Sequence, residues 1–330
     1  MTYFYYQFFY KVFKSNKKLP LPFYSEVPNS EIYGEFVFLE NQSFFTKCKQ
    51  EIIIQISRCL YKTANGYIID KTHTIFYISE QSSTIYIYSK DTMENVTLSI
   101  MGDVLALFFR LRQRYQLHAC MLHLNGNTFV LCGSSGSGKS TLAYECLGLG
   151  GRVLCDDHSI VYYEGDILLG IPSFPYLKIF STEYTGLAKN VCFPIADKKY
   201  LVAVEENHIN DFFDKEYPIS NIVFLEQNKH QDFVSKISPL SPADILVRLI
   251  KNTYANLRSN GDISLLKKDI QYLSTLKKIS NTIPCYFYQY SFDNTPNKTL
   301  TYLVDFLNRQ IDKKQTTKFK GGFYEKTNIR

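Results

Sequence analysis

Residues 133 to 140 fit the phosphate-loop pattern GxxxxGK[ST], in which residue types and spacing serve to hold a nucleotide triphosphate. In such a loop the backbone N–H groups converge on the α- and β-phosphates, and Lys139 would reach the β- and γ-phosphate oxygens. The Ser140 hydroxyl would take a place on Mg²⁺, and the N-terminus of the next helix would add partial positive charge. The predicted nucleotide site comprises Gly133, Ser134, Ser135, Gly136, Ser137, Gly138, Lys139, Ser140 and Thr141. The alternative interpretation is a Gly/Ser-rich surface turn.

A pair of carboxylates, Asp156 and Asp157, follows an apolar run that ends at Cys155. Core packing does not explain this pair, since carboxylates avoid apolar surroundings unless a cation lies nearby. Ligands of α/β sheets collect at the carboxyl ends of strands, so the pair should face the same edge as the phosphate loop. One carboxylate can hold Mg²⁺ while the other accepts a proton from an attacking hydroxyl. The alternative is a helix N-cap or an Asp pair in a turn.

The elements around the loop have the order that a phosphate site requires. A strand over 128–132 leads into the loop, and a helix over 139–149 leaves it. A strand over 117–124 and the Asn125-Gly126 turn complete a hairpin that delivers the loop. A helix stop at Gly150-Gly151 then precedes the strand that carries the Asp pair.

The rest of the chain divides near residue 100. Strand patterns over 35–39, 51–56, 74–78 and 84–88 predict a small β-rich domain, residues 1–100, as a candidate for peptide recognition. A helical period over 102–114 opens a second domain, 101–312. Further strands are expected at 160–163, 167–171, 200–204, 221–225 and 285–290, with helices at 242–258, 263–279 and 298–307. Residues 313–330 form a basic tail, which we expect to be mobile.

Composition narrows the class of protein. The 330 residues, 45% of them hydrophobic, can bury a large core. The net charge of +6 is concentrated in lysines near both ends, which is typical of solvated faces or tails rather than of a nucleic-acid groove. The eight cysteines form no CxxC pair, and no apolar run reaches the length of a membrane span. We therefore expect a cytoplasmic protein with neither a membrane nor a nucleic acid as partner.

The order of these motifs resembles the HPr kinase/phosphorylase family and its phosphoenolpyruvate carboxykinase-like relatives. That family has a His-bearing strand, GxSGxGKS, a helix, a glycine, and an apolar strand closing in Asp-Asp, and here the His is His118. The resemblance covers about residues 100 to 310 and implies an α/β fold with a phosphate-loop core of that type, preceded by the small β-rich domain.

The pattern is similar as well to HPr-kinase-like serine kinases of lasso-peptide biosynthesis. Leu117-His118-Ala119, the segment 172–178 ending in Lys178, and the pair Lys198-Lys199 match their motifs. The resemblance implies roles in phosphate contact for His118, Lys178 and Lys199, with Asp156 as the base and Asp157 as a metal ligand beside Ser140. His118 alone also fits a core histidine, and each lysine alone fits a surface charge. Arg152, Arg248 and Arg258 are further candidate cations.

Two departures separate the chain from true HPr kinases. Thr141 stands where that family has an acidic residue, and the family's C-terminal glycine-rich signature is missing. Another peptide or a small-molecule hydroxyl is thus the better acceptor. A GTPase is disfavoured because the sequence holds no DxxG element, and its Asn228-Lys229 segment places Asp232 one residue too late for NKxD.

These features predict an ATP- and Mg²⁺-dependent kinase that phosphorylates a serine hydroxyl of a precursor peptide. GTP stays open as the donor, and a homo-oligomer is compatible with the sequence. A small-molecule kinase, acting for instance on free serine, and a non-catalytic nucleotide sensor are the alternatives.

Overall fold

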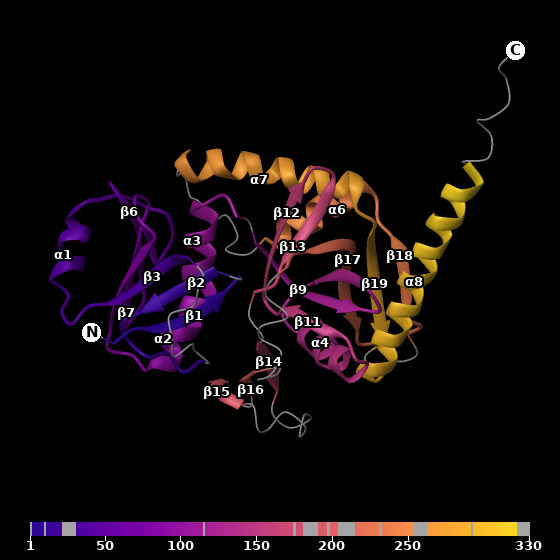
Figure 1. Cartoon of the computed structure of the whole chain (residues 1–330), viewed down its shortest axis with the longest axis horizontal. Helices are drawn as coiled ribbons and strands as arrows, with labels where there is room; N and C mark the ends of the chain where they lie inside the picture. Colours follow the sequence, from indigo (N-terminus) through magenta and orange to yellow (C-terminus); the bar gives the residue numbers. More distant parts are fainter. Residues whose placement is uncertain are drawn as a thin grey trace, which may run out of the picture.

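The computed structural model describes residues 2–9, 11–21, 31–114, 116–173, 176–180, 191–196, 199–203, 215–230, 233–253, 263–291 and 293–321. These residues form a mixed α/β structure with two eight-stranded sheets and one three-stranded sheet (Figure 1). Among them, no helix is long and apolar enough to cross a lipid bilayer.

The N-terminal sheet has an exposed helix on one face and a helical segment that completes its core on the other. Its strand order is β1 (Phe4–Phe8), β2 (Lys11–Ser15), β3 (Ile32–Phe38), β8 (Thr84–Ser89), β7 (Thr74–Ser79), β6 (Gly66–Asp70), β5 (Leu60–Thr63) and β4 (Ile52–Gln55). Helix α1 (Ser43–Gln50) packs through Phe45 and Cys48 on one side. The opposite core contains α2 (Met93–Ser99), the π-helical turn η1 (Ile100–Val104) and α3 (Leu105–Leu111).

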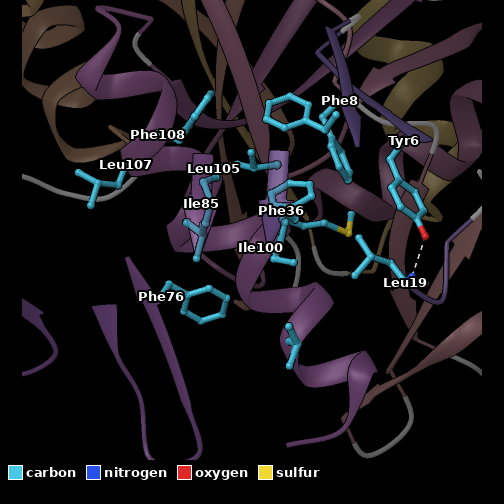
Figure 2. Close-up of a cluster of buried hydrophobic side chains, with 14 of the residues drawn as sticks. Tyr6, Phe8, Leu19, Phe36, Phe76, Ile85, Ile100, Leu105, Leu107 and Phe108 are labelled. Atoms are coloured by element: carbon cyan, nitrogen blue, oxygen red, sulfur yellow. Dashed lines mark hydrogen bonds between the residues drawn. The ribbon is translucent and has the colours of Figure 1, made fainter. Parts of the chain in front are cut away.

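The helix expected to open the second domain packs in the core of the N-terminal sheet. Figure 2 shows Leu105 and Phe108 of α3 gathered with Phe36 and Ile85 of the N-terminal sheet, and all four side chains are buried. The Phe108 ring lies 5.5 Å from that of Phe13. The helical period was read correctly, and the division of the chain near residue 100 stays a prediction. The core of the N-terminal sheet extends to the end of α3.

The second sheet closes part of itself into a ring. Its strand order is β10 (Asn127–Cys132), β9 (Gln116–Leu124), β12 (His158–Glu164), β13 (Ile167–Ile171), β17 (Tyr217–Asn228), β19 (Cys285–Ser291) and β18 (Lys236–Pro239). Strand β10 pairs with β17 as well as with β9, and β11 (Arg152–Cys155) pairs with β9. The pairs β10–β17 and β17–β19 are parallel. The carboxyl ends of these three strands therefore lie at one edge of the sheet.

Helices cover both faces of the second sheet. On one face lie α4 (Lys139–Gly148) and α8 (Pro296–Gly321), whose buried residues share a core with β9, β10 and β19. On the other lie α6 (Pro242–Lys251) and α7 (Ile263–Thr282). In Figure 1 α8 stands at the end of the molecule remote from the N-terminal sheet, and α7 runs along one side.

The three-stranded sheet connects the two large cores. Its order is β14 (Tyr176–Phe180), β16 (Lys199–Ala203) and β15 (Val191–Ala196). Tyr176 and Leu201 are buried in the core of the N-terminal sheet, whereas Leu177 and Val202 are buried in the core beneath α4. Neighbouring residues of a strand point to opposite faces, so each face of this small sheet belongs to a different core.

Several expected elements are confirmed, and others were missed. The hairpin, the strand–loop–helix order around residues 133–138, and β12, β13, β17 and β19 are present. Helix α6 ends at Lys251 rather than at 258, and residues 254–262, which include Arg258, lie outside the described residues. Residues 313–321 of the expected tail belong to α8. The sequence reading missed β1, β2, β5, β6, β14, β15, β18, α1 and α2, none of which is longer than the eight residues of α1.

If α3 is part of the N-terminal core, Phe108→Ala should lower the free energy of unfolding by about 3–5 kcal/mol, because Phe108 is fully buried and its removal leaves a cavity. Chemical denaturation followed by circular dichroism measures this loss. Ile53→Ala serves as the control, since Ile53 is 69% exposed and its truncation should cost less than about 0.5 kcal/mol. Equal losses of unfolding free energy in the two variants would show that α3 is not part of this core.

Candidate active site

The glycine-rich loop leaves β10 at the edge where the three parallel strands end. Gly136 and Gly138 have φ angles of 80° and 84°, in the left-handed region that glycine adopts without strain. Tyr290, at the end of β19, is buried against this loop and its hydroxyl donates to the Ser137 carbonyl at 2.9 Å. A Cβ atom at Gly138 would collide with that same hydroxyl. The loop conformation is therefore fixed by its glycines and by Tyr290 together.

Lys139, the first residue of α4, closes the loop from inside. Its side chain is only 6% exposed, and Nζ donates to the carbonyls of Gly133 at 2.8 Å and Ser134 at 3.2 Å. An ammonium group can be buried here because carbonyl oxygens replace its water. These bonds place a positive charge at the loop and at the N-terminus of α4, where an anion is favoured.

Asp156 is the buried member of the carboxylate pair. It is 4% exposed, and its Oδ1 accepts from the Ser140 hydroxyl at 3.0 Å. Its Oδ2 accepts from the backbone N–H of Lys178 at 3.0 Å. Burial, together with the negative charge of Asp157, raises the pKa of Asp156.

Asp157 turns toward different partners because its backbone leaves the strand conformation, with a φ of 76°. Its Oδ1 lies 3.1 Å from Nε2 of His118, and its Oδ2 forms an ion pair with Nζ of Lys178. Burial alone would raise the pKa of Asp157, but the hydrogen bond with His118 and the charge of Lys178 outweigh it and hold that pKa well below its usual value. Asp157 is thus held in its ionised form.

A cavity of about 220 Å³ joins these groups. It is lined by the loop residues Ser135, Gly136, Gly138, Lys139, Ser140 and Thr141, together with His118, Asp157, Lys178, Lys199, Gln227, Tyr290 and Asn294. Asp157 is 25% exposed as a side chain and forms part of the wall, whereas Asp156 lies behind it. The residues predicted from far-apart segments of the chain therefore surround one space.

The register of the small sheet explains why both predicted lysines reach this cavity. Lys178 pairs with Leu201, and Phe180 pairs with Lys199. Lys178 and Lys199 are consequently diagonal neighbours on one face of the sheet.

The remaining candidate cations lie elsewhere or outside the described residues. The Arg248 guanidinium stacks 4.0 Å from the centre of the Phe287 ring, and Arg152 is exposed at the start of β11. Neither lines the cavity. Lys198 and Arg258 are outside the described residues.

The structure adds residues that the sequence reading did not select. Tyr290 shapes the loop, and the side chain of Asn252, just after α6, accepts from the Gly133 N–H at 3.0 Å. Behind His118, the buried His158 ring bonds to Gln116 at 2.7 Å, and burial lowers the pKa of His158 to about 3. The sequence gives little indication of the contact between Asn252 and Gly133, because the two residues are 119 positions apart. The one signal that could have drawn attention to Asn252 is that it is a polar residue at the end of a helix.

The residues beside Ser140 suit a magnesium ion. Ser140 Oγ and the Asp156 carboxylate offer neighbouring hard oxygen ligands, and Asp156 is a buried carboxylate whose direct contacts here are neutral hydrogen-bond donors. Within the described residues, no group of three or more His, Cys, Asp or Glu side chains could hold a metal by itself. Magnesium sites commonly need only one or two carboxylates, since substrate phosphates and water supply the other ligands.

Comparison with known proteins gives a distant likeness to solved structures. No family model matches the chain, and no curated protein matches it. Among solved structures, the chain is similar to the HPr(Ser) kinase/phosphatase from Coxiella burnetii, with 15% sequence identity and a TM-score of 0.34. The match covers 61% of this chain and 98% of that one.

Gly138→Ala should weaken binding of Mg²⁺-ATP about tenfold or more, since a side chain at this left-handed position strains the backbone and meets the Tyr290 hydroxyl. Titration calorimetry measures the affinity. Gly126→Ala is the matched control, because Gly126 has a φ of 76° in the hairpin turn with nothing within 4 Å of an added Cβ. The control should lose stability but keep its affinity. Equal affinities in Gly138→Ala and the original protein would contradict this account of the loop.

Proposed function

We propose that the protein is an ATP- and Mg²⁺-dependent kinase that transfers the γ-phosphoryl group to a hydroxyl, with a serine of a precursor peptide as the acceptor. The observation that carries the proposal is the shared cavity. Lys139 and Ser140 of the glycine-rich loop line it together with the ionised carboxylate of Asp157 and with Lys178 and Lys199. The HPr-kinase-like motif order noted in the sequence supports the same reaction class.

The loop and the start of α4 would bind the nucleotide phosphates. Backbone N–H groups of residues 133–140 and the N-terminus of α4 attract negative charge, and Lys139 supplies a full positive charge at the same place. On binding, Lys139 would exchange its carbonyl partners for phosphate oxygens. The β- and γ-phosphates would then lie next to Ser140.

Ser140 and Asp156 would hold the magnesium ion, because their oxygens already lie 3.0 Å apart. A bound Mg²⁺ neutralises phosphate charge during phosphoryl transfer. This role for Asp156 differs from the one that the family resemblance implied, in which Asp157 was the metal ligand. We revise the division of roles since Ser140 contacts Asp156, and Asp157 alone of the pair lines the cavity.

Asp157 would accept the proton of the attacking hydroxyl. It faces the cavity, and His118 and Lys178 fix the direction of its two oxygens. Its lowered pKa keeps it unprotonated and ready to accept a hydrogen bond from the acceptor. Phosphoryl transfer through a loose transition state depends on positioning more than on base strength.

Three lysines would stabilise the charge that develops on the transferred group. Lys139, Lys178 and Lys199 reach the cavity from α4, β14 and β16. Fixed positive charges in a partly desolvated site act where negative charge grows on the equatorial oxygens. The Lys178 ammonium also forms an ion pair with Asp157, so the same cation would contact both the base and the transferred phosphoryl group.

The acceptor class rests on the sequence resemblance and on the domain arrangement. The N-terminal sheet shares its buried core with Tyr176 and Leu201 of the small sheet that carries both lysines. A peptide held by the N-terminal domain could thus present a serine at the neighbouring cavity. Lasso-peptide tailoring is the pathway that the motifs suggest.

Intact-mass spectrometry after incubation with ATP and Mg²⁺ tests the proposal on serine-containing precursor peptides, HPr and free serine. A gain of about one phosphate on a precursor peptide is the expected result. Phosphoserine in place of a peptide product would favour a metabolite kinase, and bound ATP without any transfer would favour a nucleotide sensor. Either outcome would overturn the peptide-kinase proposal.

Asp157→Asn should lower kcat about 10²- to 10⁴-fold while leaving the affinity for ATP nearly unchanged, because it removes the proton acceptor but no phosphate contact. Asp156→Asn should instead raise the Mg²⁺ concentration needed for half-maximal activity. Steady-state kinetics over a magnesium series separate the two effects. The reverse pattern would restore the roles implied by the family resemblance.

A further inference from the structure

The pairing of β9 with β10 stops at the point where the glycine-rich loop begins. Strand β10 pairs with β9 up to Cys132, which faces Ala119. In the same antiparallel register, the next pair would be Gly133 and His118. These two residues start the loop and carry the imidazole next to Asp157, so the end of the ladder lies inside the candidate active site.

Asn252 occupies the position of the missing pair. Its backbone carbonyl accepts from the His118 N–H at 2.6 Å, and its side-chain Oδ1 accepts from the Gly133 N–H at 3.0 Å. Its Nδ2 donates to the Arg248 carbonyl in the last turn of α6 at 2.8 Å. The next residue, Thr253, forms a bridge with Leu117 of β9. One residue thus satisfies the two backbone donors that the end of the ladder leaves open.

We propose that Asn252 is a positioning residue that ends the β9–β10 ladder and holds Gly133, at the start of the loop, apart from His118, in the wall of the cavity. With Asn252 between them, the Gly133 carbonyl is available to Lys139, which bonds to it at 2.8 Å. His118 in turn stays where its Nε2 meets Asp157. Asn252 therefore couples the nucleotide loop to the residue that orients the base, an assignment that rests on the proposed kinase function.

Asparagine suits this place because its amide offers an acceptor and a donor at once. Oδ1 serves the loop while Nδ2 donates to the Arg248 carbonyl of α6, which also accepts from the backbone N–H of Asn252 at 3.0 Å. An apolar residue of similar size would leave the Gly133 N–H without this partner. The cost should appear first as local opening of the loop.

Amide hydrogen exchange tests the positioning role without nucleotide or acceptor. In protein labelled with ¹⁵N-glycine, Asn252→Leu should speed exchange at the Gly133 amide about tenfold, which corresponds to the loss of one hydrogen bond. Unchanged exchange at Gly133 would overturn the proposal. Should Asn252→Leu fail to fold, Asn252→Ala removes the amide without adding bulk and carries the same expectation.

Thr253→Val is the matched control. It removes a hydroxyl that lies 3.0 Å from the Tyr272 hydroxyl and donates to the Leu249 carbonyl, so it loosens the same junction without touching Gly133. Exchange at Gly133 should stay within about twofold of the original protein, in contrast to the tenfold effect of losing its own hydrogen bond. If Asn252→Leu and Thr253→Val speed amide exchange at Gly133 equally, Asn252 acts through general packing and the proposal fails.

A double-mutant cycle extends the test to activity. If Asn252 acts through His118, the loss of kcat in the double variant Asn252→Leu/His118→Gln should be smaller than the product of the two single losses. A loss of kcat in the double variant equal to the product of the two single losses would contradict the coupling. An original protein that transfers no phosphate would refute the kinase function, while the exchange experiment would still decide the structural role of Asn252.

Discussion

The removal of Asp156 wholly, and of Asp157 largely, from water just after β11 is the constraint on which the site depends. Removing a carboxylate from water is costly unless hydrogen bonds and opposite charge replace its hydration. For Asp156 and Asp157 the replacements come from three elements, through Ser140 of α4, His118 of β9 and Lys178 of β14. Because each carboxylate needs its own partners, these elements must keep their mutual positions for the pair to stay buried.

Lys178 is the residue that contacts both carboxylates, and its position depends on the packing of two separate cores. Its backbone N–H serves Asp156 while its ammonium serves Asp157. Tyr176, two residues earlier, is buried in the core of the N-terminal sheet, whereas Leu177 and Ile179 are buried in the core beneath α4. The strand that satisfies the carboxylates is thus held between two cores, which ties the geometry of the site to the packing of the N-terminal domain.

Local signals in the sequence predicted the loop, the hairpin and the carboxylate pair, because glycines, a turn dipeptide and a misplaced acidic pair act within a few residues. Different roles for Asp156 and Asp157 were expected from the sequence. Their actual partners were not, since Asp157 leaves the strand with a φ of 76°. Tyr290 and Asn252 contact the loop across 153 and 119 residues, and such contacts leave no periodic trace. The helical period over 102–114 likewise predicted a helix but not the sheet on which it packs.

The geometry of Asp157 bears on the choice between a kinase and a nucleotide sensor. A sensor needs the loop, Lys139, Ser140 and one metal carboxylate, all of which the chain has without Asp157. Asp157 nevertheless occupies a left-handed backbone conformation, which costs a non-glycine residue on the order of 1–3 kcal/mol. It is also held toward the cavity by a histidine and a lysine. Strain of this kind persists where the surrounding structure enforces it, and here it directs an ionised oxygen at the space beside the phosphate loop. That placement suits a group that receives a proton from a second substrate, as the proposed kinase function requires.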